Sequence, residues 1–214
     1  MKDNRLLHLT HGSPVNFSGK LYNMVFYGTD ENGFIDYNDI YDKIVKYKPK
    51  MVVAGASAYS RTIYYNLVRE AIDKAALEIG FTPYMFVDMA HVAGLIAGGA
   101  HMSPFGYADF ITTTAQKSCR GCRGGIIFCL PELAKKVDSA VFPYAQGGSL
   151  MNEIAGKAVT AEEMLRPEFK TYAQMVVTNA KIMAEEFVKM GYDVVTGGTD
   201  NHMFLLDFSK THPN

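Results

Sequence analysis

Segments with the pattern of β-strands alternate along this chain with segments that have the pattern of α-helices, and this alternation limits the folds open to it. Residues 51–54 form a short apolar run that leads into small residues, as a buried strand entering a loop does. From 62 to 79, apolar residues recur every three or four positions and Gly80 follows, which predicts an amphipathic helix with a glycine C-cap. The sequence therefore predicts a layered α/β fold with a mostly parallel sheet.

Later segments continue the alternation. Short runs rich in β-branched and aromatic residues predict further strands at 84–87, 110–114, 125–129, 194–195 and 203–206, the last two beginning a separate small sheet. A second helical stripe runs from Phe169 to Met190. No repeat or linker interrupts the chain, so we interpret it as one unit. Ligands of such folds bind beyond the carboxyl ends of the parallel strands.

Composition excludes several classes of function. The 21 Lys and Arg residues nearly balance the 22 Asp and Glu residues, and no basic run suits a nucleic-acid backbone. The N-terminal residues lack the apolar core of a signal peptide. The most apolar stretch, 84–102, contains Asp88, His91 and His101, which argues against a membrane span. We expect a cytoplasmic protein with no nucleic-acid or membrane partner.

Cysteine content argues against disulfides and metal. Three cysteines are too few for a disulfide framework. Cys119 and Cys122 form a C-x-x-C pair, a spacing that half of a zinc site or a redox pair also shows. No second Cys/His pair at metal spacing accompanies it, and Arg120 and Arg123 flank the motif. The sequence therefore predicts no metal site.

Polar residues follow two of the predicted strands. Asp88 directly follows the strand at 84–87 and precedes His91 by three positions, a pattern typical of a helix N-cap beside a hydrogen-bonded histidine. Threonines of the strand at 110–114 lead to Lys117, and a lone lysine is usually a solvated surface residue. Together, however, the two features resemble the layout of fold-type I pyridoxal-phosphate enzymes. In those enzymes an acid follows one strand, and a lysine with a glycine-rich turn follows a later strand.

Further segments match one family of these enzymes in order along the chain. They are His8 to Lys20, Ala54 to Ser60, Val87 to His91, Ala140 to Pro143 with Gln146 to Gly148, and Gly197 to His202. In these segments the chain resembles the serine hydroxymethyltransferases. The resemblance implies the fold-type I large domain, a three-layer α/β/α structure, at 1–190 and the incomplete start of a C-terminal small domain at 191–214. Because the family's chains are longer, we expect a core that is truncated at both ends.

The resemblance also implies roles at a pyridoxal 5′-phosphate cofactor. Lys117 corresponds to the lysine that holds the cofactor as a Schiff base. Asp88 corresponds to the carboxylate that keeps the pyridinium nitrogen protonated, and His8 to the histidine that stacks on the ring. Lys117, His8 and His91 are therefore the candidate catalytic residues.

Other positions are implied around the same ring. Ser57 and His91 match residues on the phenolate and substrate side of the cofactor, and Thr114 lies on the strand beneath the ring. Gln116 stands where the family usually has a histidine, so that a cationic or proton-shuttling side chain is replaced by a neutral one. Leu7 likewise replaces a glycine beside the folate site.

Gly147 and Gly148 match a turn whose backbone N–H groups reach the cofactor phosphate of the neighbouring subunit, where a side chain would obstruct the approach. The resemblance therefore implies a homodimer, or a complementing chain that carries the missing ends. Each residue taken alone also has a simpler interpretation. The two glycines are typical of an ordinary turn, Ser57 is typical of a helix cap, and His8 is typical of a frayed N-terminus.

The implied activity is the interconversion of serine and glycine with tetrahydrofolate as the one-carbon acceptor, by a chain that is incomplete in isolation. Two alternatives stay open. A non-catalytic homologue would keep the fold as an interaction or regulatory subunit, which Gln116 favours and the retained Lys117 and Asp88 oppose. Another fold-type I activity would keep the cofactor without the folate.

Overall fold

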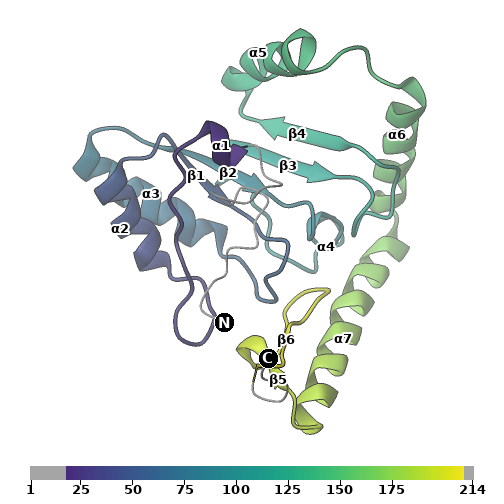
Figure 1. The fold of residues 1–214 in the computed structure, drawn as a ribbon. Helices are drawn as coiled ribbons and strands as arrows, with labels where there is room; N and C mark the ends of the chain where they lie inside the picture. Colours follow the sequence, from purple (N-terminus) through teal and green to yellow (C-terminus); the bar gives the residue numbers. More distant parts are fainter. Residues whose placement is uncertain (1–17, 210–214) are drawn as a thin grey trace.

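The computed structural model describes residues 18–209 and has a four-stranded sheet at its centre (Figure 1). The strands β1 (Met51–Ala54), β2 (Tyr84–Asp88), β3 (Phe110–Thr114) and β4 (Gly125–Cys129) are neighbours in chain order. The first three run parallel, and β4 is antiparallel to β3. These strands confirm the predicted α/β fold with a mostly parallel sheet.

The two faces of the sheet differ in how well they are covered. Alternate residues of a strand point to opposite faces. One face packs into a single core with α2 (Tyr37–Tyr47) and α3 (Tyr65–Ile79), and its buried strand residues are Val52, Ala54, Met85, Val87 and Ile111. The opposite face carries half-buried residues such as Phe86, and by the same alternation it carries Asp88. The acid therefore ends its strand on the less covered face.

Local signals set the ends of α2 and α3. Asp36 caps α2, because its side chain accepts hydrogen bonds from backbone N–H groups of the first turn. Gly80 ends α3 in the left-handed conformation, as its position in the sequence predicts. The helix begins at Tyr65 rather than at 62, since the preceding residues contact a distant segment: Thr62 N donates to Asp200 Oδ2 at 3.1 Å.

Further helices and a second, two-stranded sheet complete the described structure (Figure 1). They are α1 (Ser18–Leu21), α4 (Ala93–Ala97), α5 (Pro131–Ser139), the irregular helix η1 (Ala140–Ala145), α6 (Met151–Leu165), α7 (Pro167–Lys189), β5 (Asp193–Val194), the short helix η2 (Val195–Gly197) and β6 (Leu206–Asp207). α7 confirms the second predicted helix. β5 and β6 pair antiparallel, but the last strand starts at Leu206, so the predicted strand at 203–206 is wrong in its bounds. The residues before it form a loop that packs against the segment after β1.

Candidate active site

Three candidate residues follow neighbouring parallel strands at the same edge of the sheet. Ser57 lies in the loop after β1, Asp88 is the last residue of β2, and Lys117 lies in the loop after β3. The register pairs Ala54 with Val87, and Asp88 with Thr112 of β3. Carboxyl ends of parallel strands meet at one edge, so the three loops share the position where α/β folds bind ligands.

Gly55 lets the first two of these loops touch. Its φ is 121°, in a region that side chains disfavour. A Cβ built on Gly55 would lie 2.1 Å from the backbone oxygen of Asp88, so no other residue fits without movement of the strand end. Glycine at this position therefore brings the Ser57 loop against the acid.

Asp88 is exposed, and its Oδ1 accepts a hydrogen bond from Ala90 N at 2.9 Å. The residue at the N-cap of α4 is Val92, so the reading of Asp88 as the cap of that helix is wrong. Burial raises the pKa of the nearby Tyr65, and the charge of Asp88 contributes to the same shift. Asp88 therefore lies within electrostatic reach of Tyr65, a core residue of α3.

Ser118 joins the loop of Lys117 to the loop of Asp88. Its Oγ donates to His91 O at 2.8 Å and accepts from Gly94 N at 3.0 Å. A Cβ on Gly94 would lie 2.2 Å from Ser118 O, so the two backbones are in direct contact. Lys117 itself is half-buried. These contacts hold the half-buried amine and the segment after the acid in one rigid unit.

Two histidines meet beside Lys117. The rings of His91 and His202 are stacked, with centroids 5.8 Å apart and planes inclined by 20°. Burial lowers the pKa of His202 to about 4, and the charges of His91, His101 and Lys117 add to this effect. Burial also lowers the pKa of His101. His202 is therefore uncharged at neutral pH and lies within the electrostatic reach of the candidate lysine.

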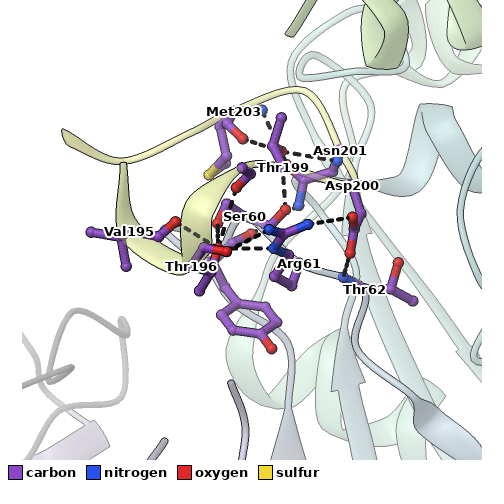
Figure 2. A network of polar contacts seen from close by, with 11 residues as sticks. Ser60, Arg61, Thr62, Val195, Thr196, Thr199, Asp200, Asn201 and Met203 are labelled. Atoms are coloured by element: carbon purple, nitrogen blue, oxygen red, sulfur yellow. Dashed lines mark hydrogen bonds and ion pairs between the residues drawn. The ribbon is translucent and has the colours of Figure 1, made fainter. Parts of the chain in front are cut away.

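A polar network fixes the loop that carries His202 (Figure 2). Arg61 Nη1 pairs with Asp200 Oδ1 at 2.8 Å, and Arg61 Nε donates to Thr196 Oγ1 at 2.9 Å. Asn201, which is almost fully buried, donates from Nδ2 to Tyr59 O at 2.8 Å. The loop after β1 therefore holds the segment after α7 and turns it toward the sheet edge.

Thr114 and Gln116 frame the lysine from within its own segment. Thr114 Oγ1 is buried and has no hydrogen-bond partner among residues 18–209. Gln116 Oε1 accepts from Gly124 N at 3.3 Å, so this side chain closes the glycine-rich turn. The residue that replaces the family's histidine thus has a backbone contact of its own.

The two candidate glycines lie apart from this cluster, and one candidate histidine lies outside the described residues. Gly147 and Gly148 are in an exposed connection between η1 and α6, which returns from the opposite end of β4 (Figure 1). Neither glycine has the positive φ that favours glycine. The helix after Ser57 has Tyr64 as its N-cap, so Ser57 is not a helix cap. His8 lies outside the described residues.

Sequence reasoning missed His101 and His202 as site residues. The segment from Gly197 to His202 matches a motif of the family, but its sequence does not predict that it packs beside His91. That proximity depends on the Arg61–Asp200 pair, whose partners are 139 positions apart. An ion pair over this separation leaves no periodic signal in the sequence.

Cysteines and acidic residues offer no alternative centre in the described part. Within residues 18–209, no group of three or more His, Cys, Asp or Glu residues is arranged to hold a metal ion, and no helix is long and apolar enough to cross a membrane. Cys119, Cys122 and Cys129 carry free thiols. Burial raises the pKa of Cys119 to about 11, which keeps its thiol protonated and unreactive.

Comparison with known families agrees with the motifs. A family model described as serine hydroxymethyltransferase matches residues 4–213. The chain belongs to the serine hydroxymethyltransferase family. Its members are fold-type I, pyridoxal-phosphate-dependent transferases of serine and glycine in one-carbon metabolism, which confirms the resemblance and the fold class predicted from the sequence.

Proposed function

We propose that this member of the serine hydroxymethyltransferase family binds pyridoxal 5′-phosphate at the sheet edge and interconverts serine and glycine, with tetrahydrofolate as the one-carbon acceptor. One observation carries the proposal. An acid and a half-buried amine follow the neighbouring parallel strands β2 and β3, and Ser118 ties their loops together. An acid–amine pair at this edge is what the cofactor of the family requires.

The residues present fit the cofactor. Lys117 would attach it, Asp88 would face its ring nitrogen, and Ser57 and His91 would lie toward its phenolate. Thr114 Oγ1 and His202 Nδ1 are buried and lack hydrogen-bond partners among the described residues. Buried polar atoms without partners are rare, and a bound polar ligand is one way to satisfy them.

The chain's own groups have distinct tasks in this chemistry. When bound, pyridoxal phosphate supplies an electron sink for the electron pair left on the substrate Cα. The Asp88 carboxylate would face the ring nitrogen and stabilise a proton there. Lys117 Nζ would be the nucleophile that holds the cofactor, and a primary amine attacks only in its neutral form.

His91 and His202 supply the imidazoles near this amine. His202 is uncharged at neutral pH, and its buried Nδ1, which has no partner among the described residues, is available to a hydrogen bond with a bound ligand. His91 is held at its backbone oxygen by Ser118 and at its ring by His202. Because Gln116 cannot exchange protons, we assign proton movement on this side of the site to His91.

The proposal extends to partners and location. Gly147 and Gly148 would approach the phosphate held by a second subunit, which makes a homodimer or a complementing chain part of the working site. Free thiols at all three cysteines suit a reducing compartment, and we propose the cytoplasm. The division between a core at 1–190 and a small domain from 191 also stays a proposal, supported by the end of α7 at Lys189.

A spectrum of the purified chain tests the function. Pyridoxal phosphate should gain the absorption band of a lysine-bound cofactor, and Lys117→Ala should abolish that band because the attaching amine is gone. Lys181→Ala, which removes an exposed lysine of α7, is the matched control and should keep it.

Three outcomes distinguish the proposed transferase from the two alternative functions. A band that responds to glycine only when tetrahydrofolate is added supports the transferase. A band with no response to the folate favours another fold-type I activity. A wild-type chain without any band contradicts cofactor binding and favours an interaction or regulatory subunit.

A further inference from the structure

Arg120 has an unusual backbone conformation three positions after the candidate lysine. Its backbone is in the left-handed region with a φ of 60°, although it is not a glycine. Arg120 N donates to Lys117 O at 2.9 Å, which closes a tight turn around the lysine. A non-glycine residue in this region is uncommon, and such conformations persist only where surrounding contacts support them.

The supporting contacts come from α7. The Arg120 guanidinium carbon lies 4.0 Å from the ring centroid of Tyr172 and 5.5 Å from that of Phe169. Phe169 is almost fully buried, and its ring lies 5.3 Å from that of Tyr172, so the arginine rests on an aromatic pair fixed to the core. A cation over an aromatic face is attractive, and arginine also stacks well on such faces.

Tyr172 contacts the same turn a second time. Its hydroxyl donates to Ser118 O at 3.4 Å, one residue after Lys117. Ser118 Oγ, in turn, bonds to the segment after β2 through His91 and Gly94. The turn that carries the amine is thus held by α7 on one side and by the loop of Asp88 on the other.

The end of the turn lies in direct contact with α6. A Cβ on Gly121 would lie 2.2 Å from Thr160 Oγ1, and Gly121 N donates to Ala115 O at 2.7 Å. Lys157 Nζ donates to Gly125 O at 3.1 Å where β4 begins. The backbone that follows Lys117 is therefore in contact with α6 and α7, two helices that contribute no side chain to the proposed reaction.

We propose that Arg120 and Tyr172 are positioning residues, which hold the turn on α7 so that the amine of Lys117 points into the site. This inference rests on the proposed cofactor role of Lys117. The contact of Arg120 with the aromatic rings stabilises the left-handed turn, and the hydrogen bond from the Tyr172 hydroxyl fixes the position of the Ser118 backbone. Loss of either contact keeps the Lys117 amine but lets it sample more orientations, which weakens the affinity for the cofactor.

The test uses the full chain and four variants. Arg120→Gln removes the cation, Arg120→Lys keeps a cation with a different shape, Tyr172→Leu removes the ring, and Tyr172→Phe keeps the ring without the hydroxyl. Arg166→Gln is the matched control, because Arg166 is exposed and forms its ion pair with Glu162 on the protein surface. Thermal unfolding identifies any variant that does not fold, and Tyr172→Phe is the mildest of the set.

Three measurements are made on each protein. Titration with pyridoxal phosphate gives the affinity from the absorption band, and borohydride reduction followed by peptide mapping gives the fraction attached at Lys117. Hydrogen exchange of residues 117–124 without cofactor reports the turn itself. We expect Arg120→Gln and Tyr172→Leu to weaken affinity about 3- to 30-fold, the range that cation–π contacts cover, and to speed exchange in this segment alone. Arg120→Lys and Tyr172→Phe should lie between them and the wild type.

The outcomes separate the two proposals. If the wild type binds the cofactor and the Arg120 and Tyr172 variants match it in affinity and exchange, the positioning role is wrong and the cofactor role stands. If the wild type does not bind the cofactor, the proposed function fails, and exchange alone decides whether the pair holds the turn. Unchanged exchange in Arg120→Gln and Tyr172→Leu then overturns the inference, and faster exchange confined to 117–124 supports it.

Discussion

Two glycines let the loops after the parallel strands approach each other. Gly55 contacts the backbone of Asp88, and Gly94 contacts the backbone of Ser118. At both positions the neighbour is backbone rather than a flexible side chain, so the space for a methyl group can come only from moving a strand end or a loop. The position of the acid relative to the amine is therefore set by residues that have no functional groups.

Gly55→Ala should destabilise the protein and weaken cofactor binding. The alanine meets both a strained φ and a contact of 2.1 Å with Asp88 O, so we expect a loss of about 1–3 kcal/mol or more in the free energy of unfolding. Urea denaturation measures the loss. Gly28→Ala is the control, because a Cβ there meets nothing within 4 Å in the described structure. Equal effects of the two variants would contradict this account.

His202 should make stability depend on pH. Its pKa is about 4 in the folded chain against 6.5 ordinarily, so between these values the unfolded chain binds a proton that the folded chain does not. The free energy of unfolding should then decrease as the pH falls from about 6.5 toward 4. His91, His101 and Lys117 are the charged or titratable groups that contribute to the shift.

Urea denaturation of the wild type and of His202→Gln at pH 8, 6 and 5 checks this expectation. The variant should lose less stability than the wild type between pH 6 and pH 5, since it has no proton to gain there. Parallel profiles for the two proteins would show that His202 is not the source.

The proposed site residues differ in how easily they can be identified from the sequence. Asp88, Ser57, His91 and Lys117 could be named because each lies within a few positions of a predicted strand end and in a family motif. His202 belongs to a motif as well, but its place beside His91 follows from side-chain contacts of another loop. Local sequence patterns therefore predict the ends of strands well, but they do not predict contacts between loops that are distant in the sequence.

At the level of whole elements, the predictable ones are those with a buried stripe. Apolar residues are buried at the period of the structure in β1, β2, β3, α3 and α7, so the positions of these elements could be predicted. β4 has no buried residue, and its prediction rests on its β-branched and aromatic residues. α4 is five residues of small apolar character and shows no period, and α6 is mostly exposed, so burial imposes no stripe on it. The antiparallel direction of β4 could not be predicted either, because a strand pattern has no direction.

The contact between Arg61 and Asp200 should couple the loop after β1 to the loop before β6. Asp200 is partly exposed, with a side-chain exposure of 39%, so we expect a coupling of only about 1 kcal/mol between the two residues. A double-mutant cycle with Arg61→Gln and Asp200→Asn, measured by urea denaturation, gives the value. Lys43 and Asp39, an i,i+4 pair within α2, are a control for which the coupling should be smaller. Additive effects of the Arg61 and Asp200 variants would contradict the role of this pair.

The molecule as a whole has one well-covered sheet face and one half-covered face, and Asp88 ends its strand on the latter. The family match extends over residues 4–213, so the similarity includes both the sheet and the loops that close over it. Assembly with a second subunit is the proposal that accounts for the exposed turn at Gly147 and Gly148.

Gly148→Val tests that assembly. A Cβ on Gly148 meets nothing within 4 Å in the described part of the chain, so the variant should keep the thermal stability of the cofactor-free protein. If the turn reaches the phosphate held by a partner subunit, affinity for pyridoxal phosphate should fall about tenfold, or ~1.4 kcal/mol. Titration gives the affinity and light scattering gives the subunit number. Wild-type affinity in the variant would contradict a role of this turn in the neighbouring site.

The 139-position separation within the Arg61–Asp200 pair has a consequence for how the protein matures. Contacts between distant parts of a chain form late, because closing a long loop costs entropy before any attraction is gained. A nascent chain on the ribosome can complete the parallel strands well before His202 emerges, and until then the stack of His91 and His202 cannot form. We therefore expect this protein to complete its candidate site only once synthesis has passed that histidine.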